Sequence, residues 1–112
     1  MGNFKEIKRE ELKKWLEEKK DFFLFDVLPQ DSYEVKHLPK AKHAAASEGN
    51  FLEEIEKVVP NKDAVIVVYC ASFTCQLSPR AATMLIEEGY TNIYDFKGGL
   101  ADWQDAEYSF AE

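Results

Sequence analysis

The stretch Ala64-Val65-Ile66-Val67-Val68-Tyr69-Cys70 decides the fold, because it is an apolar, β-branched run that ends on a cysteine. Continuous apolar runs of this length are typical of strands covered on both faces of a parallel sheet. The polar loop Ala71-Ser72-Phe73-Thr74-Cys75-Gln76 follows, and an apolar pattern with helical spacing then occupies residues 77–86. This order predicts that Cys70 lies at the C-terminal end of a buried strand. There the backbone N–H groups of the loop and the positive end of the next helix can converge on its sulfur and favour the thiolate.

The rest of the chain alternates between strand and helix patterns. Helical spacing predicts helices over residues 10–20, 51–59 and 100–106, with a helical turn near residues 31–36. Apolar runs predict further strands over residues 22–27 and 92–96. We therefore predict one α/β domain over residues 1–112, with a mostly parallel sheet flanked by helices. Reactive groups in such sheets lie at the carboxyl ends of the strands, where Asp26 and Cys70 both fall.

Composition excludes several classes of function. The 112 residues carry 14 Lys and Arg against 21 Asp and Glu, so the net charge of -7 argues against nucleic acid and anionic membrane surfaces as partners. No apolar signal core or membrane-length segment is present, and two cysteines do not make a secreted disulfide framework, so we expect a cytoplasmic protein. No spacing of Cys and His predicts a zinc site.

Four segments occur in an order that identifies a family. They are Phe25-Asp26-Val27-Leu28, His37-Leu38-Pro39-Lys40-Ala41, Val67-Val68-Tyr69-Cys70 and Gly98-Gly99-Leu100-Ala101-Asp102-Trp103. Together they resemble the single-domain rhodaneses, whose pattern runs Asp-Val-Arg, His-Ile-Pro-Gly-Ala, a strand ending in cysteine with a six-residue loop, and Gly-Gly before a tryptophan. The resemblance spans nearly the whole chain and implies a rhodanese-like fold.

The resemblance also implies a sulfurtransferase that works through a persulfide. Cys70 would attack the outer sulfur of a donor, carry it as Cys–S–SH, and pass it to a thiol, to cyanide or to a protein sulfur acceptor. The backbone amides of the loop would cradle the anionic sulfur, and the loop consists of Ala71, Ser72, Phe73, Thr74, Cys75 and Gln76. A ring of N–H donors at a helix N-terminus is an anion site on physical grounds as well. No metal or organic cofactor is needed for this chemistry.

The sequence departs from the family pattern at the loop. Cys75 stands where Arg is usual and Gln76 where Ser is usual, while Leu28 and Lys40 replace an Arg and a Gly elsewhere. A loop Arg would bind the oxygens of thiosulfate bidentately. Its absence favours polysulfide or a small-thiol persulfide as donor. Arg80, on the following helix, is the candidate to compensate, since helical side chains lean toward the N-terminus.

Cys75 leaves two interpretations open. It is either a resolving thiol that captures the Cys70 persulfide or sulfenate as a disulfide, or a small residue in place of Arg without a redox role. The first interpretation also supports an alternative function, a non-catalytic module that binds a partner or senses oxidants. A phosphatase of related fold would need a loop one residue longer that ends in Arg, but Gln76 occupies that place.

Three further residues or motifs have a structural interpretation beside a functional one. Asp26 is a candidate supporting group, either as a general acid–base or as an acceptor for loop amides. For His37 we expect a structural hydrogen bond. Gly98-Gly99 lacks the spacing of a phosphate-binding motif, so we predict a tight turn with positive φ.

Overall fold

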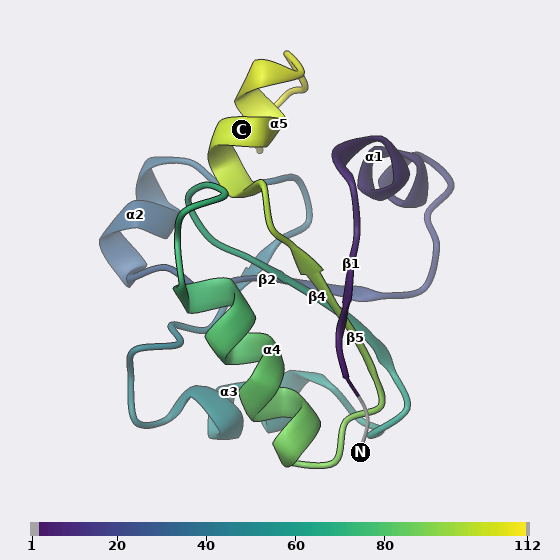
Figure 1. The fold of residues 1–112 in the computed structure, drawn as a ribbon, viewed down its shortest axis with the longest axis vertical. Coiled ribbons are helices and arrows are strands. Elements are labelled where there is room, and N and C mark those ends of the chain that lie inside the picture. The colour runs from purple at the N-terminus through teal and green to yellow at the C-terminus, as the bar shows by residue number, and fades with distance from the viewer. Residues whose placement is uncertain (1–2, 112) are drawn as a thin grey trace.

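The computed structural model describes residues 3–111 and contains a five-stranded, entirely parallel sheet in the order β1-β5-β4-β2-β3 (Figure 1). The strands are β1 (Lys5–Glu6), β2 (Phe23–Asp26), β3 (Lys42–His43), β4 (Val65–Tyr69) and β5 (Asn92–Phe96). The helices are α1 (Arg9–Glu17), α2 (Gln30–Val35), α3 (Phe51–Val58), α4 (Leu77–Glu87) and α5 (Gly99–Asp105). The α/β class and the parallel sheet predicted from the sequence are confirmed.

Helices cover the sheet on both faces, which is why its central strands are apolar throughout. On one face, α3 and α4 pack on the sheet through side chains that include Phe51, Ile55 and Leu85. On the other face, α1 and α5 pack through side chains that include Leu12 and Trp103. Figure 1 shows the two helix pairs on opposite sides of the strands. Successive residues of β4 therefore alternate between two apolar cores.

Two short strands were not predicted from the sequence. β1 pairs with β5 at one edge of the sheet, and β3 pairs with β2 at the other. Each is two residues long. A periodic pattern needs at least four residues to be recognised, so strands this short leave no pattern of alternation in the sequence.

The register of the central strands determines what lies at the carboxyl edge of the sheet. Tyr69 of β4 lies opposite Asp26 of β2 and opposite Phe96 of β5. The ladder continues past the strand end, where the Val27 N–H donates to the Tyr69 carbonyl at 3.0 Å. Cys70, the next residue along the chain, therefore emerges at the centre of this edge.

Candidate active site

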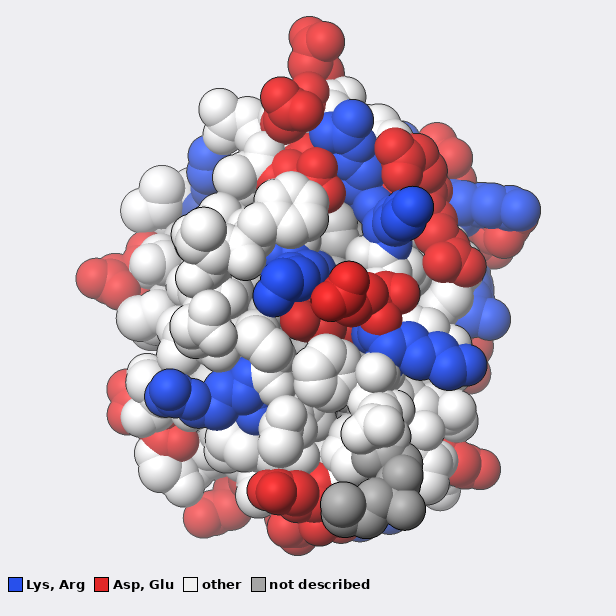
Figure 2. Space-filling model, viewed as in Figure 1, with Lys and Arg blue, Asp and Glu red and all other residues white. Residues whose placement is uncertain are grey.

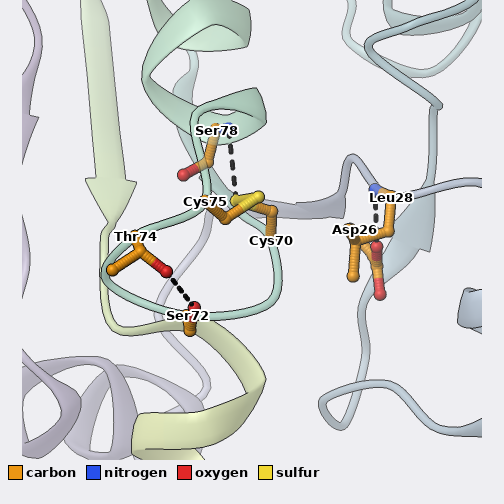
Figure 3. Close-up of a disulfide and its surroundings, with 7 residues drawn as sticks. All are labelled: Asp26, Leu28, Cys70, Ser72, Thr74, Cys75 and Ser78. Carbon is orange, nitrogen blue, oxygen red and sulfur yellow. Dashed lines mark hydrogen bonds between the residues drawn. A yellow bond between two sulfur atoms is a disulfide. The ribbon is translucent and has the colours of Figure 1, made fainter.

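Cys70 and Cys75 form a disulfide at the carboxyl end of β4 (Figure 3). Their Cα atoms lie 6.4 Å apart, within the range of native disulfides. Cys70 is fully buried in the core beneath α4, whereas Cys75 is partly exposed. The loop therefore brings the two thiols within bonding distance, which the sequence left open, while the resolving role of Cys75 stays a prediction.

A tight turn within the loop directs Cys75 back toward Cys70. The Cys75 N–H donates to the Ser72 carbonyl at 3.0 Å, which closes a turn of four residues. The hydroxyls of Ser72 and Thr74 lie 3.1 Å apart across this turn and share a hydrogen bond (Figure 3). Short hydroxyl side chains that bond locally are typical of such turns.

The Cys70 sulfur lies at the N-terminus of α4. The Ser78 N–H, in the first turn of this helix, points at Cys70 Sγ with a nitrogen–sulfur distance of 3.4 Å. The first N–H groups of a helix have no partner within the helix, so they stabilise an anion placed there. Within residues 3–111, Ser78 supplies the hydrogen bond that reaches this sulfur. The amide cradle predicted for residues 71–76 remains a prediction for the reduced or persulfide-bearing protein.

The start of the loop is anchored by α5. The Leu100 N–H donates to the Cys70 carbonyl at 3.0 Å, and the Ala101 N–H donates to the Ala71 carbonyl at 2.9 Å. Gly99 has φ +60, and a Cβ at this position would collide with the Cys70 carbonyl. Only glycine permits both this backbone conformation and this close approach. The sequence predicted the positive φ of the Gly-Gly turn, but not that this turn seats α5 on the site.

A family model described as "Rhodanese-like domain" matches residues 8–106 of this chain. The chain belongs to this family. A relative from Coxiella burnetii, "Thiosulfate sulfurtransferase GlpE", is 32% identical over 94 residues, covering 83% of this chain and 82% of that protein. "Adenylyltransferase and sulfurtransferase UBA4" from Candida albicans is 34% identical over 94 residues, which cover 80% of this chain and only 21% of the larger protein.

Solved structures bear out the rhodanese-like fold. BH2092 from Bacillus halodurans superposes with a TM-score of 0.84 at 21% identity, covering 96% of this chain and 76% of that one. Among the described residues of this rhodanese-like chain, no helix is long and apolar enough to cross a membrane. The same part of the chain holds no group of three or more His, Cys, Asp or Glu side chains arranged to bind a metal ion.

Asp26 lies on the other face of the sheet from Cys70. Phe25, the preceding residue of β2, packs in the same core as Cys70. Consecutive side chains of a strand point to opposite faces, so the Asp26 side chain points to the face covered by α1 and α5. Its Oδ1 atom accepts the Leu28 N–H at 2.9 Å (Figure 3). Burial raises the pKa of Asp26, and the Leu28 N–H opposes that shift. The geometry is that of an acceptor for loop amides, as one of the two predicted interpretations has it.

The two histidines support the segment between β2 and β3. His37 stacks on Tyr33, with ring centroids 3.9 Å apart, and its Nδ1 atom lies 2.8 Å from the Tyr33 carbonyl oxygen. His43 Nε2 lies 2.6 Å from the Leu28 carbonyl oxygen. Both rings bond backbone groups of the same segment, which is the arrangement expected of structural histidines.

Asp95 is a buried carboxyl that the sequence analysis missed. It lies in β5 opposite Val68 and therefore shares the face of Cys70. Within the described residues, neither of its carboxylate oxygens has a hydrogen-bond partner. Burial is the main cause that raises the pKa of Asp95. A single acidic residue inside the apolar strand 92–96 was the one feature of the sequence that indicated it.

The segment that carries the disulfide has no positively charged side chain of its own. Residues 71–79 contain no Lys or Arg, and Figure 2 shows a largely uncharged surface where Figure 1 places the loop and the start of α4. Arg80 is exposed, and its side chain makes no hydrogen bond or ion pair with the described residues. Its predicted role in compensating for the missing loop Arg is therefore still a prediction.

Proposed function

We propose that this protein is a sulfurtransferase that carries sulfane sulfur as a persulfide on Cys70. Its donor is thiosulfate, polysulfide or a small-thiol persulfide, and its acceptor is a nucleophile such as a thiol or cyanide. The observation that carries the proposal is the position of Cys70 Sγ, at the end of β4 and 3.4 Å from the Ser78 nitrogen at the N-terminus of α4. The relative named thiosulfate sulfurtransferase, at 32% identity, supports the same class of activity.

The chemistry begins from the reduced pair. The Cys70 thiolate attacks the outer sulfur of the donor, a new sulfur–sulfur bond forms, and the remainder of the donor leaves with the electron pair of the broken bond. The Ser78 N–H and the N-terminus of α4 stabilise the anionic sulfur before and after this step. An acceptor then attacks the outer sulfur and regenerates the thiolate.

The charge around the loop bears on the choice of donor. Residues 71–79 offer no cationic side chain to a sulfonate group, and the exposed Arg80 is the first one along the chain. A polysulfide or a small-thiol persulfide needs less recognition of anionic oxygens than thiosulfate does. We expect these donors to load Cys70 faster than thiosulfate does at equal concentration.

Intact-protein mass spectrometry tests the proposal. The reduced protein, freed of reductant, is incubated with thiosulfate or polysulfide as wild type, Cys70→Ser and Cys75→Ser. We expect an adduct of about 32 Da that cyanide removes, present in Cys75→Ser and absent in Cys70→Ser. Equal uptake of cyanide-removable sulfur by Cys70→Ser would overturn the assignment of Cys70.

The disulfide itself favours a second candidate function, a redox-sensing module without turnover. In the oxidised state Cys70 is fully buried and bonded to Cys75, so it is closed to any donor. Such a module would form the disulfide with mild peroxide and reopen it with a thiol, yet load sulfur from none of the donors. Sulfur loading on Cys70 with any donor decides against this candidate.

A further inference from the structure

The bond partner of Cys70 in this structure is not a sulfur donor but a second cysteine of the same loop. Only five positions separate Cys70 and Cys75, and the turn from Ser72 to Cys75 directs the second thiol to the first. A persulfide formed on Cys70 would therefore lie beside a thiol that reaches its inner sulfur. A neighbouring thiol held this way competes strongly with any acceptor in solution.

We propose that Cys75 discharges the Cys70 persulfide as hydrogen sulfide, so that the protein reduces sulfane sulfur at the expense of a dithiol. This inference rests on the proposed function, because it starts from the loaded Cys70. The Cys75 thiolate attacks the inner sulfur, the Cys70–Cys75 bond forms, and the bond between the inner and outer sulfurs breaks. The outer sulfur leaves as HS⁻ with the electron pair, while the proton of the Cys75 thiol is given up to solvent. The two cysteines are oxidised to the disulfide, and the sulfane sulfur is reduced to sulfide.

The structure contains the product of this step, the Cys70–Cys75 disulfide, and the contacts that hold Cys70 in place. The backbone of Cys70 and Ala71 is held by the amides of α5, and the sulfur of Cys70 is held by the Ser78 N–H. Cys75 lies in the part of the loop between these two anchors and is partly exposed. Cys70 therefore stays in place while the bond forms and breaks, and the change in geometry falls to the loop that carries Cys75.

Burial also gives the regeneration step a direction. Cys75 is the partly exposed residue of the pair and Cys70 is fully buried, so a dithiol reductant has its access at Cys75. Attack at Cys75 expels Cys70 as the leaving thiolate, which the N-terminus of α4 stabilises. The second thiol of the reductant then frees Cys75, so both cysteines return to the reduced state that accepts sulfur.

A single-turnover experiment with no added reductant tests the inference, and thiosulfate is the decisive donor because it leaves sulfite, so that Cys75 is the one thiol available to discharge the persulfide. Reduced wild type, Cys75→Ser, Cys75→Ala and Cys70→Ser are desalted without oxygen and given one equivalent of thiosulfate or glutathione persulfide. We expect wild type to release about one equivalent of sulfide and to become about 2 Da lighter, as a disulfide does. Both Cys75 variants should instead keep an adduct of about 32 Da and release no sulfide above the Cys70→Ser background.

The outcomes separate this inference from the proposed function. If wild type keeps the adduct as the Cys75 variants do, discharge by Cys75 is wrong while sulfur loading on Cys70 stands. Equal sulfide release by wild type and both Cys75 variants also overturns discharge by Cys75. If the correctly folded Cys75 variants take up no sulfur from either donor, the proposed function fails, and the inference fails with it. Two Cys75 variants guard against a substitution that disturbs the fold.

Discussion

The ends of β2 and β4 are neighbours in the sheet, yet they place their polar groups on opposite faces. Asp26 and Cys70 are both fully buried, and both lie at the carboxyl edge that commonly holds reactive groups. Cys70 faces α4, while Asp26 faces the side of α1 and α5. A position at the carboxyl edge of the sheet is therefore not sufficient to place a residue in the active site. Side chains alternate between the two faces along a strand, so the position within the strand decides which helices the residue contacts.

The two strand ends also differ in what holds them. The β4 end is fixed by α5 through Leu100 and by α4 through Ser78, and both contacts converge on Cys70. The β2 end bonds its own following loop, through the Leu28 N–H on Asp26. The first arrangement supports chemistry at a sulfur, and the second stabilises a connection between strands.

The largest expected effect is that of Cys70→Ser, which removes the nucleophile from the β4 end. Relative to Cys75→Ser, in which no second thiol discharges the persulfide, sulfur transfer to cyanide should fall to background, a loss of at least about 1000-fold, because a serine hydroxyl is not ionised at neutral pH. The rate of thiocyanate formation measures this effect. Cys75→Ser is the matched control, since it makes the same replacement of sulfur by oxygen five residues away, and this variant should still load sulfur on Cys70. Comparable thiocyanate formation by both variants would contradict the assignment.

Gly99→Ala should damage the β4 end through the backbone. The alanine Cβ would meet the Cys70 carbonyl at a position with φ +60, so α5 and the loop must separate. We expect the free energy of unfolding to fall by about 2–4 kcal/mol, together with slower loading of Cys70. Urea unfolding and mass spectrometry measure the two effects. Gly49→Ala is the control, because nothing lies near its Cβ and its φ is not positive. Equal stability of the two variants would refute this role of Gly99.

The sequence was informative where residues carry a pattern over many positions. The run from Ala64 to Tyr69 predicted the central strand, and the four ordered segments predicted the family. The pairing of Cys70 with Cys75 stayed open because it depends on one turn of four residues, at Ser72 to Cys75.

Contacts between segments far apart in the chain could not be predicted from the sequence, for a different physical reason. Gly99 touches Cys70 only because β4 and β5 pair in one particular register, which a single sequence does not reveal. Ser78 looked like an ordinary helix residue, since its part in the site is played by a backbone N–H that every residue type except proline possesses. The short strands β1 and β3 were not predicted, because two residues are too few to show an alternation of apolar and polar side chains.

Asp95→Asn is expected to change stability in a way that depends on pH. Burial raises the pKa of the folded carboxyl above its unfolded value, so the folded state binds the proton more tightly. The stability that proton binding to Asp95 contributes is present at acid pH and is lost as the pH rises through the pKa of the folded state. Asparagine does not titrate, so the variant should gain stability relative to wild type between pH 4 and pH 8, by at most about 2 kcal/mol.

Urea unfolding of wild type and Asp95→Asn at both pH values measures this difference, in which the shared titrations of the other groups cancel. A difference in stability that stays constant, or that shrinks as pH rises, would contradict a raised pKa for Asp95. This residue lies on the Cys70 face, so the result also tells whether that face contains a buried carboxylate at neutral pH.

The smallest expected effect is that of Asp26→Asn on sulfur transfer, which should stay within about threefold of wild type. The amide keeps an oxygen to accept the Leu28 N–H, and the side chain lies on the face away from Cys70. Asp26→Ala removes that acceptor and should lower the free energy of unfolding by about 1–3 kcal/mol while Cys70 still loads sulfur. Loss of transfer in a stable Asp26→Asn protein would show that the two strand ends act together despite facing opposite sides. That result would support the other interpretation of Asp26, in which it takes part in sulfur transfer as a proton donor or acceptor.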